Sequence, residues 1–113
     1  MHELSIAQGI VRIAMKYAEL HKAERVARID ITIGALSGVE SEALSFCFPF
    51  AAEGTVCEGA ELGVTIEKGK GSCEKCGASV EVSDLMTVCP ACGNWPLKVE
   101  GGNEMLIKSL EVI

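Results

Sequence analysis

Aromatic residues are scarce in this sequence: three phenylalanines, one tyrosine and one tryptophan make up 4% of its 113 residues. A core must therefore be mostly aliphatic, and the 49% hydrophobic content is enough to build one. That content excludes general disorder, and the length fits a small globular protein. Long apolar runs are lacking as well. None approaches the roughly 18 residues that a membrane-spanning helix needs, so no membrane segment is expected.

Basic residues are also in short supply, with 10 Lys and Arg against 16 Asp and Glu and a net charge of −6. Nucleic-acid binding requires a basic surface, so nucleic acid is not expected as a partner. The first residues, Met1–Ser5, contain no basic stretch followed by an apolar one. A secretory signal is therefore not visible, and a cytoplasmic location is expected.

Cysteine is the abundant exception, because six occur in this short chain. Four of them form two Cys-x-x-Cys pairs, separated by twelve residues: Cys73, Cys76, Cys89 and Cys92. Each pair can turn two sulfurs toward one ion, and two pairs supply a tetrahedron, which predicts a structural zinc site. Gly77 and Gly93 follow the pairs and permit the positive φ that closes such turns. Two disulfides, a redox dithiol and bound iron are the alternatives.

Hydrophobic periodicity predicts two helices. Ser5 and Gln8 have the spacing of a capping box, and apolar residues then recur at helical spacing to about His21. On this interpretation the residues before Ser5 precede the helix. Ser37 and Glu40 form a second possible capping box, which opens a helix that Pro49 should stop.

Alternating apolar residues predict strands at 26–33, 61–67 and 105–113, with a shorter one around Val80 and Val82. Residues 69–71 read as a linker. A helix between the first two long strands indicates a βαβ-like crossover. The predicted fold is α+β: a small mixed three-stranded sheet with two helices, plus a zinc-ribbon-like lobe with four cysteines. The expected domains are 1–69 with 101–113, and 70–100.

The first two residues have a chemistry of their own. A free α-amine on Met1, the amide nitrogen of His2 and its imidazole Nδ1 can chelate one ion in fused rings. An all-nitrogen, near-planar set of this kind suits Ni(II) or Cu(II). Taken alone, a histidine at position 2 is more often an exposed residue than a ligand.

Several segments together resemble the HypA/HybF family of nickel metallochaperones. The resemblance runs in order along the whole chain through the opening Met-His-Glu-Leu-Ser, residues 33–40, Gly54-Thr55-Val56, Glu58-Gly59-Ala60, the two cysteine pairs and the closing 107–112. The opening residues combined with four such cysteines make it specific.

The resemblance implies an α+β nickel-binding domain formed by residues 1–69 and 101–113, and a zinc-binding domain formed by 70–100. By position, Met1, His2 and Glu3 correspond to the nickel site, and the four paired cysteines correspond to the zinc ligands. It further implies delivery of Ni(II), with a partner GTPase, to the large subunit of [NiFe]-hydrogenase, and in some organisms to urease maturation. A monomer or weak homodimer is expected.

Other residues leave alternatives open. Glu40, water or a partner's group could complete the nickel site, although a capping role is preferred for Glu40. His21 is expected to interact with the helix dipole. Cys47 and Cys57 are expected to be buried small hydrophobes. No nucleophile–base pair or phosphate loop indicates an enzyme. The competing functions are a zinc-ribbon adaptor or nucleic-acid module and a thiol–disulfide protein.

Overall fold

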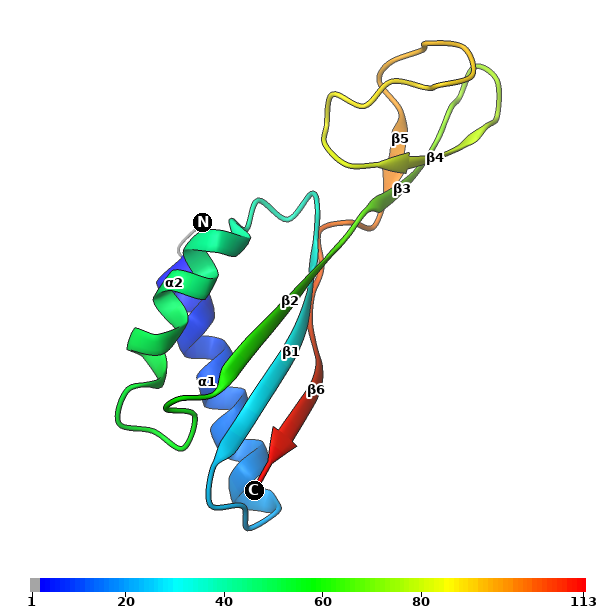
Figure 1. The fold of residues 1–113 in the computed structure, drawn as a ribbon. Helices are drawn as coiled ribbons and strands as arrows, with labels where there is room; N and C mark the ends of the chain where they lie inside the picture. The colour runs from blue at the N-terminus through cyan, green and yellow to red at the C-terminus, as the bar shows by residue number, and fades with distance from the viewer. Residues whose placement is uncertain (1–2) are drawn as a thin grey trace. The chain divides into compact units, whose positions relative to one another are not determined.

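The computed structural model describes residues 3–113, which form two helices and two three-stranded sheets (Figure 1). The α+β fold class predicted from the sequence is confirmed. In chain order the elements are α1 (Glu3–Leu20), β1 (Val26–Gly34), α2 (Ser41–Ala52), β2 (Glu61–Glu67), β3 (Gly69–Ser72), β4 (Ser79–Val82), β5 (Lys98–Glu100) and β6 (Met105–Val112).

The first helix begins earlier than predicted. It starts at Glu3, so Ser5 lies within the first turn and is not its cap. Glu3 places a carboxylate in that first turn, where the helix dipole favours negative charge. The expectation that the residues up to Leu4 precede the helix is therefore wrong for Glu3 and Leu4.

The second helix corrects two predictions. It starts at Ser41 with Glu40 as the N-cap residue, and Glu40 makes no side-chain cap hydrogen bond. The predicted Ser37–Glu40 capping box does not form. Pro49 lies inside the helix and does not stop it, because the chain remains helical to Ala52. Phe48, just before the proline, and Ala52, at the end of the helix, are both buried, and this packing outweighs the hydrogen bond that proline cannot donate.

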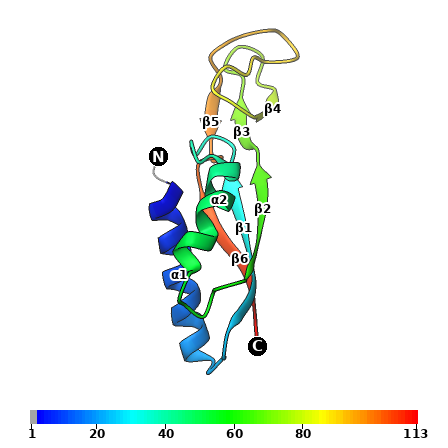
Figure 2. The same cartoon turned by 60° about the vertical axis from the view of Figure 1, so that its left-hand side comes forward.

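The larger sheet has the order β2-β1-β6. Figure 1 shows β1 and β2 running the same way and β6 the opposite way, as expected for a strand–helix–strand crossover followed by a returning strand. All three strands were predicted. Both helices lie on one face of the sheet (Figure 2). That face is aliphatic: Ile10 of α1, Ile29 and Ile31 of β1 and Leu44 of α2 are fully buried.

The smaller sheet has the order β4-β3-β5, and both of its strand pairs are antiparallel. Its central strand, β3, occupies the segment that was predicted to be a linker. Gly71 pairs with Val80 of β4 on one side and with Val99 of β5 on the other. This residue is therefore part of the sheet and not of a flexible connection. Glycine is selected here by space, since a Cβ would lie 2.7 Å from Cγ2 of Val82.

Contacts divide the chain into two compact units. One contains residues up to Thr32, Val39–Thr65 and Leu106–Ile113, and the other contains Ile33–Gly38 and Ile66–Met105. Within the part of the chain that the structure describes, neither helix is long and apolar enough to cross a membrane.

Candidate metal centre

The two Cys-x-x-Cys pairs converge on one point in the smaller unit. The sulfur atoms of Cys73, Cys76, Cys89 and Cys92 all lie within 4.8 Å of one another. Sγ of Cys73 is 3.5 Å from that of Cys92, and Sγ of Cys76 is 3.6 Å from that of Cys89. A bonded disulfide would require about 2.05 Å, so these are unbonded thiols. Cys73 and Cys89 are buried, while Cys76 and Cys92 face solvent.

Matching backbone turns hold the two pairs. The amide of Cys73 donates to the carbonyl of Ala78 (2.9 Å), and the amide of Gly77 donates back to the carbonyl of Cys73 (2.7 Å). The second turn repeats this pattern. There Cys89 donates to Asn94 (3.0 Å) and Gly93 donates to Cys89 (2.7 Å).

Gly77 and Gly93 have φ of 75° and 74°, as predicted from their position after each pair. The two carbonyl acceptors, Ala78 and Asn94, were not predicted. Their signal is positional, because each is the fifth residue after the first cysteine of its pair.

The four thiols fall into two pairs by pKa: it is lowered at Cys73 and Cys89 and raised at Cys76 and Cys92. The backbone amide of Cys76 donates to Sγ of Cys73 (3.4 Å) and lowers the pKa of Cys73 to about 6. An amide at Cys92 likewise lowers the pKa of Cys89. The backbone of Ala78 favours the thiolate of Cys76, but Cys73 and Cys89 outweigh it and raise the pKa of Cys76 to about 12. Without a cation, therefore, the cluster resists full ionisation.

A divalent cation suits this cluster on chemical grounds. It removes the repulsion among the thiolates, and a tetrahedron with bonds of about 2.3 Å places sulfurs about 3.8 Å apart. The Sγ–Sγ separations of 3.5 Å (Cys73–Cys92) and 3.6 Å (Cys76–Cys89) are near that value. The centre is thus suited to a metal such as zinc, and four sulfurs fill its coordination sphere. Such a site holds structure together and leaves no open position for catalysis.

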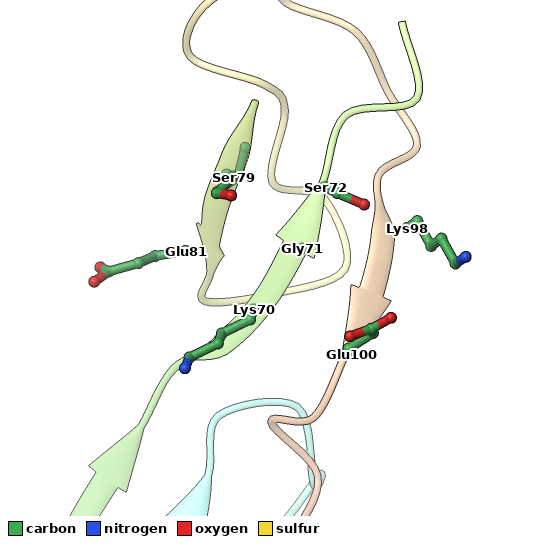
Figure 3. Close-up of a pocket in the computed structure, with 8 residues that line it drawn as sticks. Lys70, Gly71, Ser72, Ser79, Glu81, Lys98 and Glu100 are labelled. Atoms are coloured by element: carbon green, nitrogen blue, oxygen red, sulfur yellow. The ribbon is translucent and has the colours of Figure 1, made fainter. Parts of the chain in front are cut away.

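A second feature of the same unit is a hollow of about 530 Å³ over the β4-β3-β5 sheet. Figure 3 shows Lys70 and Glu81 directed to one side of Gly71, with Lys98 and Glu100 on the other. Their charged ends spread apart around the glycine. The hollow therefore presents separate polar groups rather than a set that converges on one reacting atom.

Of the predicted nickel residues, Met1 and His2 lie outside the described residues. Glu3 is described: its Oε2 accepts a hydrogen bond from the backbone amide of Glu40 at 3.3 Å. The first residue of α1 is thereby joined to the N-cap of α2. Sequence reasoning missed this link, because 37 residues separate the two glutamates.

The second histidine lies at the opposite end of α1. His21 follows the last helical residue, and its ring lies 4.3 Å from that of Tyr17 between centroids. A helix of 18 residues is about 27 Å long, so His21 is far from Glu3. Within this chain it cannot share an ion with Glu3.

The two unpaired cysteines differ in burial. Cys57 is fully buried, as predicted, and its Sγ lies 4.0 Å from the carbonyl oxygen of Val11. Burial raises the pKa of the Cys57 thiol. Cys47 is half-buried on α2, so the expectation of burial is met in full by Cys57 alone.

Comparison with known proteins identifies the family. A family model described as hydrogenase/urease nickel incorporation, metallochaperone, hypA matches residues 1–112. The chain belongs to the HypA family. It is 41% identical over 112 residues to the hydrogenase maturation factor HypA of Chlorobaculum tepidum, covering 99% of each chain. The HypA of Psychromonas ingrahamii is also 41% identical, with 99% and 98% of the two chains covered.

The fold of this chain also agrees with that of a solved HypA structure. The solution structure of the Ni metallochaperone HypA from Helicobacter pylori matches with a TM-score of 0.68 and 28% identity, over 100% of this chain and 98% of that one. HypA proteins are metallochaperones of hydrogenase maturation rather than enzymes, as the sequence analysis predicted.

Proposed function

We propose that this protein carries Ni(II) on its first residues and delivers it for assembly of [NiFe]-hydrogenase. A partner GTPase and the hydrogenase large subunit are the proteins with which it would act, together with urease maturation proteins in some organisms. The observation that carries the proposal is the bond between Glu3 and the Glu40 amide. It joins Glu3, which directly follows Met1 and His2 in the sequence, to the N-cap residue of α2, and this supports a proposed site that includes Glu3 and Glu40.

In the proposed nickel site the Met1 amine, the amide nitrogen and Nδ1 of His2, and Glu3 surround the ion. Amine, amide and imidazole nitrogens favour Ni(II), and none of them is a thiolate that would hold the ion too firmly for transfer. Glu40 is a candidate for a remaining position, because its side chain makes no cap hydrogen bond. Proton competition for imidazole and amine should weaken nickel binding below about pH 6.5.

In the proposed division of labour, residues 1–69 and 101–113 form the nickel domain, and residues 70–100 form the zinc domain. Cys73, Cys76, Cys89 and Cys92 would hold Zn(II), with the two buried sulfurs turned inward. Two observations support this division. All four sulfurs lie close together in one short segment, and the buried hydrophobic cluster of that segment is small.

The test is a nickel titration of four proteins, with zinc content measured on each. These are the native chain, His2→Ala, a version extended by one residue before Met1, and His21→Ala as a matched histidine control. We expect the first two variants to lose tight nickel binding, while His21→Ala binds normally and all four keep one zinc per chain. Undiminished nickel binding by the extended version would contradict the proposed site.

A further inference from the structure

Two phenylalanine rings stand out of the surface of α2. Phe46 is 71% exposed and Phe50 is 63% exposed, and their ring centroids are 5.6 Å apart. They occupy the side of the helix opposite the buried Leu44 and Phe48. The chain has three phenylalanines, and two of them are exposed to water. Without a partner, these two rings expose a large amount of apolar surface.

Carboxylates bracket this aromatic pair. Glu42 lies four residues before Phe46, so the two share one face of α2, and Glu53, the C-cap residue of this helix, follows three residues after Phe50. Both glutamates are exposed. The surroundings carry no compensating charge in sequence, because no lysine or arginine lies between Arg28 and Lys68.

The same region of α2 also borders a hollow. A depression of about 390 Å³ is lined by Pro49, Phe50, Glu53, Glu58 and Ala60, among others. Pro49 has no amide hydrogen, so it cannot donate to the Ser45 carbonyl one turn earlier. This end of the helix therefore lacks one donor of the helical hydrogen-bond ladder, and it borders a recess whose rim carries Glu53 and Glu58.

We propose that the α2 stripe (Glu42, Phe46, Phe50 and Glu53) is a docking surface for a basic amphipathic helix of another protein. The aromatic pair takes the partner's apolar residues, and the two glutamates take its cations. Glu42 and Glu53 are eleven residues apart, which is about 16 Å along a helix. A fitting partner helix places two cations at that spacing on either side of an apolar pair.

A second copy of this chain does not fit as the occupant. Its helix α1 carries Arg12 and Lys16, which are only four residues apart, and α2 has no cation. An anionic membrane does not fit either, because the carboxylates of the stripe would be repelled from it. Both therefore serve as outcomes that would overturn the proposal.

The test uses the full-length, zinc-containing protein and a labelled 15-residue helical peptide. The peptide has two leucines four residues apart, with a lysine four residues before the first and another three residues after the second. A matched peptide has glutamate in place of both lysines. Fluorescence anisotropy should show binding of the basic peptide at least about ten-fold tighter than binding of the acidic one, with an advantage that shrinks in high salt.

Three variants locate the binding. The double variant Phe46→Ser with Phe50→Ser should bind the basic peptide at least about ten-fold more weakly than the native chain does. The control variant Leu85→Ser with Met86→Ser removes similarly exposed apolar residues elsewhere, and it should leave the affinity for the basic peptide unchanged. Because both phenylalanines are exposed, circular dichroism should show that the first variant folds. Glu42→Lys with Glu53→Lys keeps the aromatic pair and should reverse the preference, so that the acidic peptide binds better.

Several results would overturn the proposal. One is equal binding of both peptides by the native chain, and another is an equal loss in the Leu85 and Met86 control. A failure of the charge-reversed variant to change preference is a third. Phe46-dependent dimerisation in sedimentation, or Phe46-dependent binding to phosphatidylserine vesicles, would assign the stripe to one of the two rejected occupants instead.

Discussion

The two compact units are stabilised by different means. In the first, α1, β1 and α2 share an aliphatic core in which Ile10, Ile29 and Leu44 are fully buried. In the second, the buried cluster is Cys73, Val80 and Cys89, with Ala78 and Leu97 packed against it. Two of those three buried residues are metal-ligand candidates. We therefore expect burial to suffice for the first unit and a bound ion to be needed for the second.

The largest expected effect comes from removing a buried sulfur. Cys73→Ser should reduce zinc from one per chain to near zero and unfold residues 70–100, because structural zinc contributes about 10–16 kcal/mol in small zinc-finger peptides. Amide NMR spectra should show loss of dispersion in that segment and retention in α1 and β1. The matched control is Cys47→Ser on α2, which should keep its zinc. A variant that remains folded throughout without zinc would contradict the metal dependence.

The next largest effect is a cavity in the aliphatic core. Leu44 has 0% exposure, so Leu44→Ala should lower the free energy of unfolding of the first unit by about 2–5 kcal/mol. Zinc content should not change. Leu85→Ala, at a residue that is 72% exposed, should cost no more than about 0.5 kcal/mol. Loss of zinc from Leu44→Ala would show that the two units are not stabilised independently.

Replacing a glycine by alanine should change the free energy of unfolding in opposite directions in the two units. Gly77 has φ of 75°, so Gly77→Ala should cost about 1–2 kcal/mol and weaken zinc retention against a chelator. Gly9 lies inside α1 with open space around it, so Gly9→Ala should stabilise the helix by about 0.5–1 kcal/mol. Urea unfolding and chelator competition measure the two effects. The same sign at both positions would contradict the assigned backbone roles.

The smallest effect is a pH dependence confined to the core. Burial raises the pKa of Cys57 in the folded state above its unfolded value. The unfolded chain therefore loses this proton first, and the stability of the first unit should fall as the pH rises above about 8.5. Unfolding of Cys57→Ala between pH 7 and 10 should show a smaller decline than the native chain. An identical decline in both proteins would exclude Cys57 as its source.

How far the sequence predicts the structure also differs between the units. The three strands of the larger sheet were predicted because their apolar residues alternate, and the cysteine cluster was predicted because the spacing alone suffices to bring four sulfurs together. The helix starts were wrong. Ser5 and Ser37 have capping-box spacing, but Glu3 already lies in α1, and Glu40 is the cap residue of α2.

The remaining errors have a common physical cause. Pro49 is tolerated inside α2 because Phe48 and Ala52 are held in the core, and β3 uses glycines as a central strand because its neighbours leave no room for side chains. The Glu3–Glu40 hydrogen bond is likewise tertiary. None of these contacts is local in sequence, so no local pattern could predict them.

The central claim is that the carried ion and the structural ion are held by different kinds of atoms. X-ray absorption at the nickel edge of the protein loaded with one Ni(II) per chain tests it directly. The expected first shell contains nitrogen and oxygen only, and it should be lost in His2→Ala. Thiolate sulfur at nickel-bonding distance would contradict the claim, because it would place the carried ion on a cysteine.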